Sequence, residues 1–402
     1  MFNKTKLYIA LFAIIFFAGL LYSCDKFEPK EPEEEDLLDG PIEGLTYAEN
    51  VRFLKGDIAF NDDVFTVEKG LGPLFNANSC VSCHAGDGKG TPFTALIKFG
   101  QTDSTGNKFL DQGGPQLQTK AIPGYEPETL PEGATYTKLV PPAVTGLGYL
   151  QYVTDEDIIA MSDPDDLNND GIRGVPNWKE LDDYLTPAEG AIERNGKYIH
   201  RFGKKASIYN LLNQTVFAYN EDMGITSIFD PIDTYSGLSL EPEVSAATIR
   251  DQVAYLETLK APIQRNQDDE QVIDGKEIFK RINCAACHKP ELKTGYAPIE
   301  ALSHKTFHPY TDLLLHDMGP ELDDGYTEGS AKTSEWRTAP LWGLGLSPDS
   351  QGKVYYLMHD GRAKSIEAAI LMHGGEAEKS KNKFRELTES EKENLLKFLE
   401  SL

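Results

Sequence analysis

Apolar residues recur at helical spacing near the end of each half of the chain. Residues 252–262 (QVAYLETLKAP) and 394–402 (NLLKFLESL) repeat them every three or four positions, which predicts two amphipathic helices. Between these segments, the polar stretch QRNQDDEQ predicts a boundary near residue 262. We therefore expect two helical domains, 50–262 and 263–402, in a mainly α fold with long irregular connections such as 86–150.

The same spacing places a histidine on the buried face of a helix. Ile366, Ala369, Ile370 and His373 stand at i, i+3, i+4 and i+7. The surrounding segment HDGRAKSIEAAILMH, which starts at residue 359, matches HRFGKKASIYNLLNQ from residue 200 at four positions with identical spacing. The two halves therefore share one design, and the position of His373 corresponds to Thr215 in the first half.

The first 23 residues are typical of an export signal. Lys4 and Lys6 precede an apolar run over 7–22, which is shorter than the roughly 20 residues that a membrane-spanning helix needs. The run closes with LYSC, which resembles the lipobox of bacterial lipoproteins; an uncleaved anchor is the alternative. We expect cleavage before Cys24, acylation of that residue and an acidic tether over 24–49. The protein would then be a lipid-anchored lipoprotein outside the cytoplasm, in the periplasm or at the outer membrane.

The charge of the chain narrows the choice of partner. A formal net charge of −25 argues against nucleic acid, because a phosphate backbone is bound by neutralising it with Lys and Arg. A macromolecular partner is expected to be basic. The length of 402 residues suits two domains that each bury a core.

Four of the five cysteines lie in two Cys-x-x-Cys-His motifs. These supply Cys80, Cys83 and His84 in the first half and Cys284, Cys287 and His288 in the second. Two thiols one helical turn apart can add to the vinyl groups of a haem, and the adjacent histidine then reaches its iron. A zinc site would need four ligands, and a thioredoxin-like dithiol expects a βαβ setting. The repeat therefore favours two covalent c-type haems, with His84 and His288 as proximal ligands.

The sixth ligand decides what each iron can do, since a strong ligand favours electron transfer and an open site admits small oxidants. In the second half we expect His373 to be this ligand, with Met372 and Met358 as alternatives.

In the first half the corresponding position is Thr215, beside Gln214, and neither side chain binds iron well. We expect an open or weakly held site here, lined two turns further on by Glu221 and Asp222. His200 is the nearby residue that could close it.

One acidic stretch has the spacing of a metal loop. Asp166, Asn168 and Asp170 alternate before Gly171, as in the first half of a calcium loop. The twelfth position is Asn177 where such loops have glutamate. Calcium and a simple acidic turn are both open as interpretations.

These motifs resemble the di-haem oxidoreductases sometimes labelled thiol oxidoreductase-like, which are similar to bacterial di-haem cytochrome c peroxidases. The resemblance covers about 70–402 and includes GLGPLFNANSCVSCHAGDGKG, RFGKKA with DMGITS, TDLLLHDMGPELDDG, EWRTAPLWGLG and MHDGRAKSIEAAILMHGGEA. It implies two cytochrome c-like domains in which the C-terminal haem receives electrons and the N-terminal haem meets peroxide.

The resemblance also implies roles for single residues. Asp222 falls where the peroxidases place a distal glutamate, and Gln214 is displaced by two residues from their distal glutamine. Three arginines are suited to bind the haem propionates, namely Arg201, Arg337 and Arg362. The alternative is that they form exposed salt bridges. The chain departs from these relatives at Lys204, which puts the inter-haem electron route in doubt.

The sequence thus predicts an enzyme that reduces peroxide at the first haem with electrons delivered through the second. A non-enzymatic electron carrier and an oxidase of a thiol or protein side chain are the alternatives, because one fold serves enzymes and carriers. The expected donor is a small redox protein, such as a basic cytochrome, or a quinol-linked chain.

Overall fold

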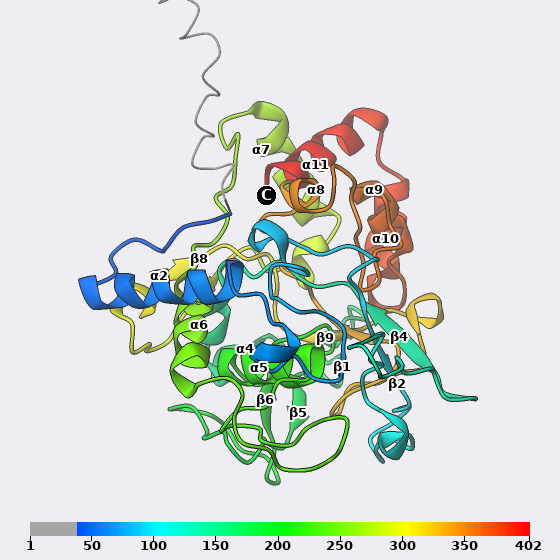
Figure 1. Ribbon diagram of the computed structural model, residues 1–402. Coiled ribbons are helices and arrows are strands. Elements are labelled where there is room, and N and C mark those ends of the chain that lie inside the picture. Colours follow the sequence, from blue (N-terminus) through cyan, green and yellow to red (C-terminus); the bar gives the residue numbers. More distant parts are fainter. Residues whose placement is uncertain (1–37) are drawn as a thin grey trace, which may run out of the picture. The chain divides into compact units, whose positions relative to one another are not determined.

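Two helix pairs organise the computed structural model, which describes residues 38–402. In one, α2 (Tyr47–Asn61) packs against α6 (Ala246–Thr258), and in the other α7 (Glu270–Arg281) packs against α11 (Glu389–Ser401) (Figure 1). Each pair joins the beginning of one half of the chain to its end. The helices predicted at the end of each half are therefore present.

Short helices and strands make up most of the rest of the described chain. The further α-helices of the described part are α3 (Leu147–Gln151), α4 (Asp155–Met161), α5 (Leu211–Phe217), α8 (Ser347–Ser350), α9 (Ile366–Met372) and α10 (Glu378–Arg385). The strands form two-stranded antiparallel sheets: β1 (Leu74–Phe75) with β3 (Lys120–Ala121), β2 (Leu96–Phe99) with β4 (Tyr136–Leu139), β5 (Asn177–Lys179) with β6 (Tyr198–His200), β7 (Leu292–Lys293) with β8 (Thr306–Phe307), and β9 (Leu315–Asp317) with β10 (Glu335–Arg337). The expectation of a mainly α fold is met only in part, because the segments that connect the helices form these small sheets.

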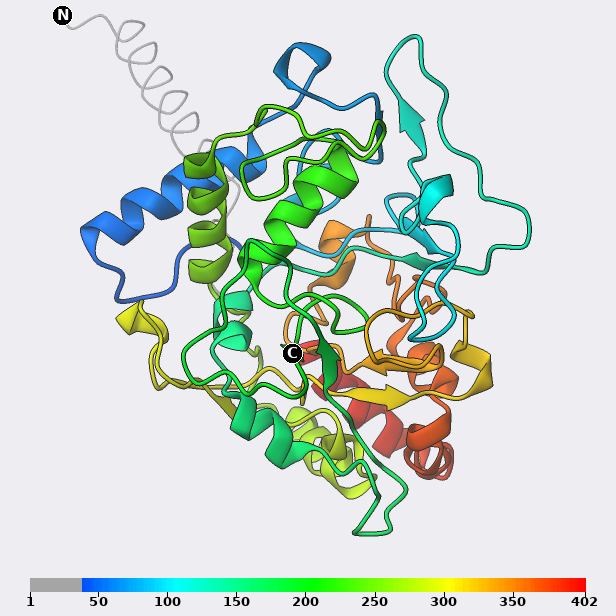
Figure 2. The ribbon, with the colours of Figure 1, turned by 90° about the horizontal axis from the view of Figure 1, so that it is seen from below.

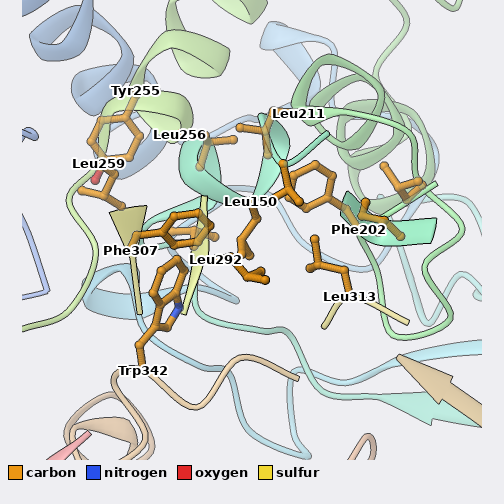
Figure 3. Packing of buried hydrophobic residues seen from close by; sticks show 14 of the residues in the cluster. Leu150, Phe202, Leu211, Tyr255, Leu256, Leu259, Leu292, Phe307, Leu313 and Trp342 are labelled. Carbon is orange, nitrogen blue, oxygen red and sulfur yellow. The ribbon is translucent and has the colours of Figure 1, made fainter. Parts of the chain in front are cut away.

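The largest hydrophobic cluster draws on both halves of the sequence. Leu150, Phe202 and Tyr255 lie in it together with Phe307 and Trp342, whose rings are 5.9 Å apart (Figure 3). A second cluster contains only residues from 272 onwards and lies around α7, α9 and α11. Residues 38–402 form one compact unit. Segments far apart in sequence interleave in the view from below (Figure 2).

A glycine at the crossing point of each helix pair allows the two backbones to approach closely. A Cβ atom on Gly56 of α2 would lie 2.1 Å from the carbonyl oxygen of Asp251, and one on Gly275 of α7 would lie 2.1 Å from that of Asn394. Both distances are far below van der Waals contact. The helix pairs of the two halves are therefore built alike.

One local expectation is wrong. The sequence before each Cys-x-x-Cys-His motif suggests a short helix running into it, and α7 does so in the second half. In the first half, a 3₁₀ turn at Val67–Lys69 and strand β1 stand there instead. The helix equivalent to α7 is α2, which ends well before Cys80.

The expected signal peptide and Cys24 lie outside the described residues, as does most of the tether. Within 38–402, no helix has both the length and the apolar character needed to cross a membrane.

The close helix crossing leads to a stability prediction. Gly275→Ala should lower the free energy of unfolding by about 1–3 kcal/mol, because the added methyl group must push α11 away. Denaturant unfolding followed by circular dichroism measures the loss. The neighbouring exposed variant Asp274→Ala should stay within about 0.5 kcal/mol of wild type. Equal stability of the two variants would contradict the packing argument.

Candidate functional site

The first Cys-x-x-Cys-His motif forms a single turn with its histidine directed by one hydrogen bond. The amides of Cys83 and His84 both donate to the carbonyl of Cys80, at 3.1 and 3.0 Å. His84 Nδ1 lies 2.9 Å from the carbonyl oxygen of Pro142. Because a carbonyl only accepts, Nδ1 carries the hydrogen and Nε2 keeps its lone pair. Burial lowers the pKa of His84 to about 4, which keeps the ring neutral.

The second motif repeats this arrangement at the end of α7. Asn283 adopts a left-handed conformation (φ 73°) that ends the helix, and the amide of His288 donates to the carbonyl of Cys284 at 3.0 Å. His288 Nδ1 lies 3.0 Å from the carbonyl oxygen of Tyr310, so Nε2 is again the free nitrogen. Burial lowers the pKa of His288 to about 4.

His373 faces His288 across a gap of suitable width for a metal. It is the C-cap residue of α9, and its Nδ1 lies 2.7 Å from the carbonyl oxygen of Ala369. The ring centroids of His288 and His373 are 6.5 Å apart. Two imidazoles on opposite sides of one metal, each at about 2 Å through Nε2, place their centroids roughly 6 Å apart. The pair therefore fits a six-coordinate iron.

One cavity of about 460 Å³ connects the two motifs. All six motif residues line it, together with His373 and the two side chains expected at the first distal site, Gln214 and Asp222. The remaining walls are mainly aliphatic and aromatic. The fold therefore brings the predicted attachment, ligand and distal residues to a common space.

Part of the cavity wall comes from α5 and the π-helical turn Ala218–Asp222 that follows it. Such turns often occur at functional sites. The Thr215 hydroxyl donates to the carbonyl of Leu211 at 2.8 Å and is occupied within the helix. Among the described residues that line the cavity, α5 and this turn supply no histidine.

His200 does not close the first site. It does not belong to the cavity wall, and its Nδ1 lies 3.1 Å from the carbonyl oxygen of Tyr198. Its ring lies 5.5 Å from that of Tyr209.

Asp222 is held in place by a residue that the sequence did not single out. The side-chain amide of Gln116 donates to Asp222 Oδ1 at 2.7 Å and to the carbonyl of Glu221 at 2.9 Å. Burial raises the pKa of Asp222 to about 6, while this hydrogen bond and the charge of Lys98 oppose the rise. Burial raises the pKa of Glu221 to about 7, but Glu221 does not line the cavity.

Lys98 and Glu328 form a buried ion pair in the cavity wall, with Nζ and Oε1 2.7 Å apart. The backbone of Lys98 bridges to that of Gln116, so this part of the chain supports Asp222 in two ways. Hydroxyl donors from Ser207 and Tyr326, at 2.5 and 3.1 Å, complete the shell of Glu328. No motif in the sequence marks these residues, because the pairing spans 230 positions.

Three cations line the same cavity without a carboxylate partner among the described residues. Lys204 and Lys89 have pKa values lowered to about 7 and 8 by burial, and the pKa of Arg337 is lowered to about 10. Arg337 donates from Nε to the carbonyl of Gly203 at 2.8 Å, whereas its Nη1 is buried with no partner. This arrangement fits the carboxylates of a bound haem.

The other two arginines proposed for propionates lie elsewhere. Arg201 is ion-paired with Asp155 at 2.5 Å and donates to the carbonyls of Gln151 and Val153. Arg362 pairs with Asp360 and Asp324 and does not line the cavity. Both side chains are already neutralised by acids, so we do not assign them to a haem.

The acidic loop is satisfied by its own backbone. Asp166, Asn168 and Asp170 accept hydrogen bonds from the amides of Gly171, Asp170 and Ile172, at 3.0, 2.8 and 2.8 Å. These contacts are those of a self-capped acidic turn. They give calcium no particular support.

A zinc site is likewise poorly matched at the second motif. Cys287, Asp312 and His316 are the one group of three in the described part whose ligand atoms lie within 4.8 Å of one another. Both ring nitrogens of His316 are engaged by carboxylates, Nδ1 by Glu376 at 2.7 Å and Nε2 by Asp312 at 2.9 Å. Burial opposes protonation of His316, but these carboxylates outweigh it and raise the pKa of the ring well above its usual range, which leaves the ring without a lone pair for a metal.

A family model described as "Di-haem oxidoreductase, putative peroxidase" matches residues 137–402. Among the curated proteins, none matches. Hydrazine synthase from Kuenenia stuttgartiensis, in a xenon-pressurised structure, is 13% identical with a TM-score of 0.40, covering 94% of this chain and 96% of that one. A MauG-like protein associated with microbial copper homeostasis is 14% identical with a TM-score of 0.40, covering 94% and 95%.

Proposed function

Since this chain belongs to the di-haem oxidoreductase family, we propose that it reduces peroxide at the first motif with electrons that enter through the second. The observation that carries this proposal is the difference between the two sites. His288 has the ring of His373 beside it, whereas His84 shares the cavity with Gln214 and Asp222 and has no second histidine ring beside it among the described residues. A site without a strong sixth ligand is the one that admits a small oxidant.

Each haem would be held by residues of its own motif. Cys80 and Cys83 would form the thioethers of the first haem and Cys284 and Cys287 those of the second. The iron ligands would be Nε2 of His84, and of His288 and His373. Lys89, Lys204 and Arg337 would neutralise the propionates. A bound haem supplies the electrons and the site at which an oxidant binds.

Asp222 would carry the proton. Reducing one peroxide to two waters consumes two electrons and two protons, and breaking the O–O bond requires a proton on the departing oxygen. Asp222 Oδ can take the proton from one peroxide oxygen and give it to the other. Gln214 would hold the peroxide by hydrogen bonding. The free enzyme needs Asp222 ionised, so the rate should rise as the pH passes about 6.

The cellular setting belongs to the same proposal. We place the protein outside the cytoplasm on a lipid anchor at Cys24, with a basic cytochrome or a quinol-linked chain as donor. The support is the sequence of the first 24 residues and the charge of −25.

The first prediction concerns the cofactors. Protein matured outside the cytoplasm should carry two covalent haems, as intact mass and a pyridine haemochrome assay can show. Replacing Cys80 and Cys83 with Ala should halve the haem content, because the second motif remains. Cys24→Ala should keep both haems and release the protein from the membrane. Haem that acid-acetone extracts from the wild type would contradict covalent attachment.

The second prediction concerns His373. Its replacement with Met should raise the reduction potential of the second haem, because thioether ligation favours the ferrous state. The spectrum of the first haem should hardly change. Met358→Leu and Met372→Leu serve as controls and should leave both spectra intact. A low-spin spectrum that survives His373→Ala would transfer the ligand role to a methionine.

The third prediction concerns proton transfer. Asp222→Asn should slow peroxide reduction by roughly 10²–10⁴ while both haems stay attached, since general acid–base help has this size. Gln116→Leu should slow peroxide reduction less than Asp222→Asn does. It should also move the midpoint of the pH–rate profile above 6, because it removes a hydrogen bond that stabilises the ionised carboxylate of Asp222.

Gln118→Leu is the matched control for the Gln116 variant. Gln118 donates to the carbonyl of Glu221 at 2.7 Å rather than to the Asp222 side chain, so its loss should leave the midpoint unchanged. Equal pH shifts in the two variants would remove Gln116 from the mechanism. If both haems of the wild type are low-spin and six-coordinate in every redox state, and peroxide turnover matches free haem, the protein is an electron carrier instead.

A further inference from the structure

A second cleft, of about 850 Å³, opens on the other side of Glu376 from the second motif. Its walls come from the end of α4, the segment 171–178 that bridges to β9, and the turn Gly375–Ala377 after α9. Both halves of the sequence therefore contribute. Its volume lies within the range of small-molecule sites, which is about 300–1,000 Å³.

The acids of this cleft are committed to neighbouring groups. Glu376 accepts from the amides of Arg173 and Asp317, at 2.9 and 3.1 Å, as well as from His316. Asp317 caps the amide of Gly319 at 2.9 Å. Glu335 accepts from the amide of Lys332 at 2.8 Å and pairs with its Nζ at 3.2 Å. Glu376 and Glu335 are each paired with a cationic side chain, which leaves Asp317 as the described acid of the cleft without one.

Two guanidinium groups in the cleft have no carboxylate partner among residues 38–402. These belong to Arg173 and Arg194. Arg194 lies over the ring of Trp178, 4.5 Å from its centroid. Both residues are exposed, so their guanidinium groups are accessible to an anion that enters the cleft. A guanidinium on an aromatic ring is well placed to bind a carboxylate in bidentate fashion.

We propose that this cleft binds a small organic anion, with its carboxylate on Arg173 and Arg194 and its apolar body against Trp178 and Ile159. The size of the cleft and its aromatic wall favour an organic ligand over an inorganic ion. Glu376 belongs to the wall of the haem cavity as well, so the ligand would lie one side chain away from the second motif. The binding does not depend on the peroxide reaction proposed above.

Isothermal titration calorimetry of the haem-loaded protein with benzoate tests this site, and inorganic phosphate is the comparison ligand. Benzoate should bind with one site per chain. Arg173→Gln and Arg194→Gln should each weaken it about tenfold to hundredfold, the size expected for charged hydrogen bonds. Trp178→Leu should weaken benzoate but not phosphate. Arg250→Gln is the matched control, because Arg250 also lies over a ring, that of Phe229, and should have no effect.

A salt series on the wild type needs no variant. Benzoate binding should weaken when the ionic strength rises from about 0.01 to 0.1 M, because the Debye length falls from about 30 to 10 Å. Absence of benzoate binding at millimolar concentration would overturn the proposal. Binding that is insensitive to Arg173→Gln and Arg194→Gln would also overturn it. If phosphate binds as tightly as benzoate and Trp178→Leu has no effect, the cleft is a site for inorganic anions. That result would contradict the proposal of an organic ligand.

Discussion

Hydrogen bonds from histidine rings to main-chain carbonyls determine how the centre of this protein is built. His84, His288 and His373 each donate Nδ1–H to a carbonyl, at 2.7 to 3.0 Å. The carbonyl fixes the tautomer, and burial keeps each ring neutral, so Nε2 is left as a free ligand atom. The acceptors of His84 and His288 come from Pro142 and Tyr310, which lie 58 and 22 residues further along the chain. The loops that supply these carbonyls are therefore part of the site.

The space that these histidines line is one that a bound haem would stabilise. The cavity is mainly apolar, yet Lys89, Lys204 and Arg337 line it, and their lowered pKa values report the cost of charge there. Buried cations without partners are destabilising. A haem would fill the apolar space and bring carboxylates to the cations, so it would remove the cost of an empty cavity and the cost of unpaired charge. Its binding would therefore add to the stability of the folded chain.

The two sites differ because the helices that cover them begin at different points. α9 begins five residues after Gly361, with Ser365 as its cap, and brings His373 to its end. α5 begins eight residues after Gly203 and continues into a π-helical turn that ends at Asp222. Because α5 begins later after its glycine than α9 does, equivalent sequence positions in the two halves fall at different places on these helices. A shared sequence design thus presents different side chains to the cavity in the two halves.

The sequence by itself determined the features that depend on neighbouring residues. The motif spacing and the final helix of each half follow from local periodicity, and α6 and α11 overlap the predicted segments. His373 lies at the end of α9 as its C-cap rather than on the buried face within the helix. Only the tertiary structure decided which polar groups meet. It placed Gln116 on Asp222 and Lys98 on Glu328, paired Arg201 with Asp155, and left Arg337 facing the cavity. These pairings join positions up to 230 residues apart. Nothing in the local sequence around a charged residue indicates which distant residue will pair with it.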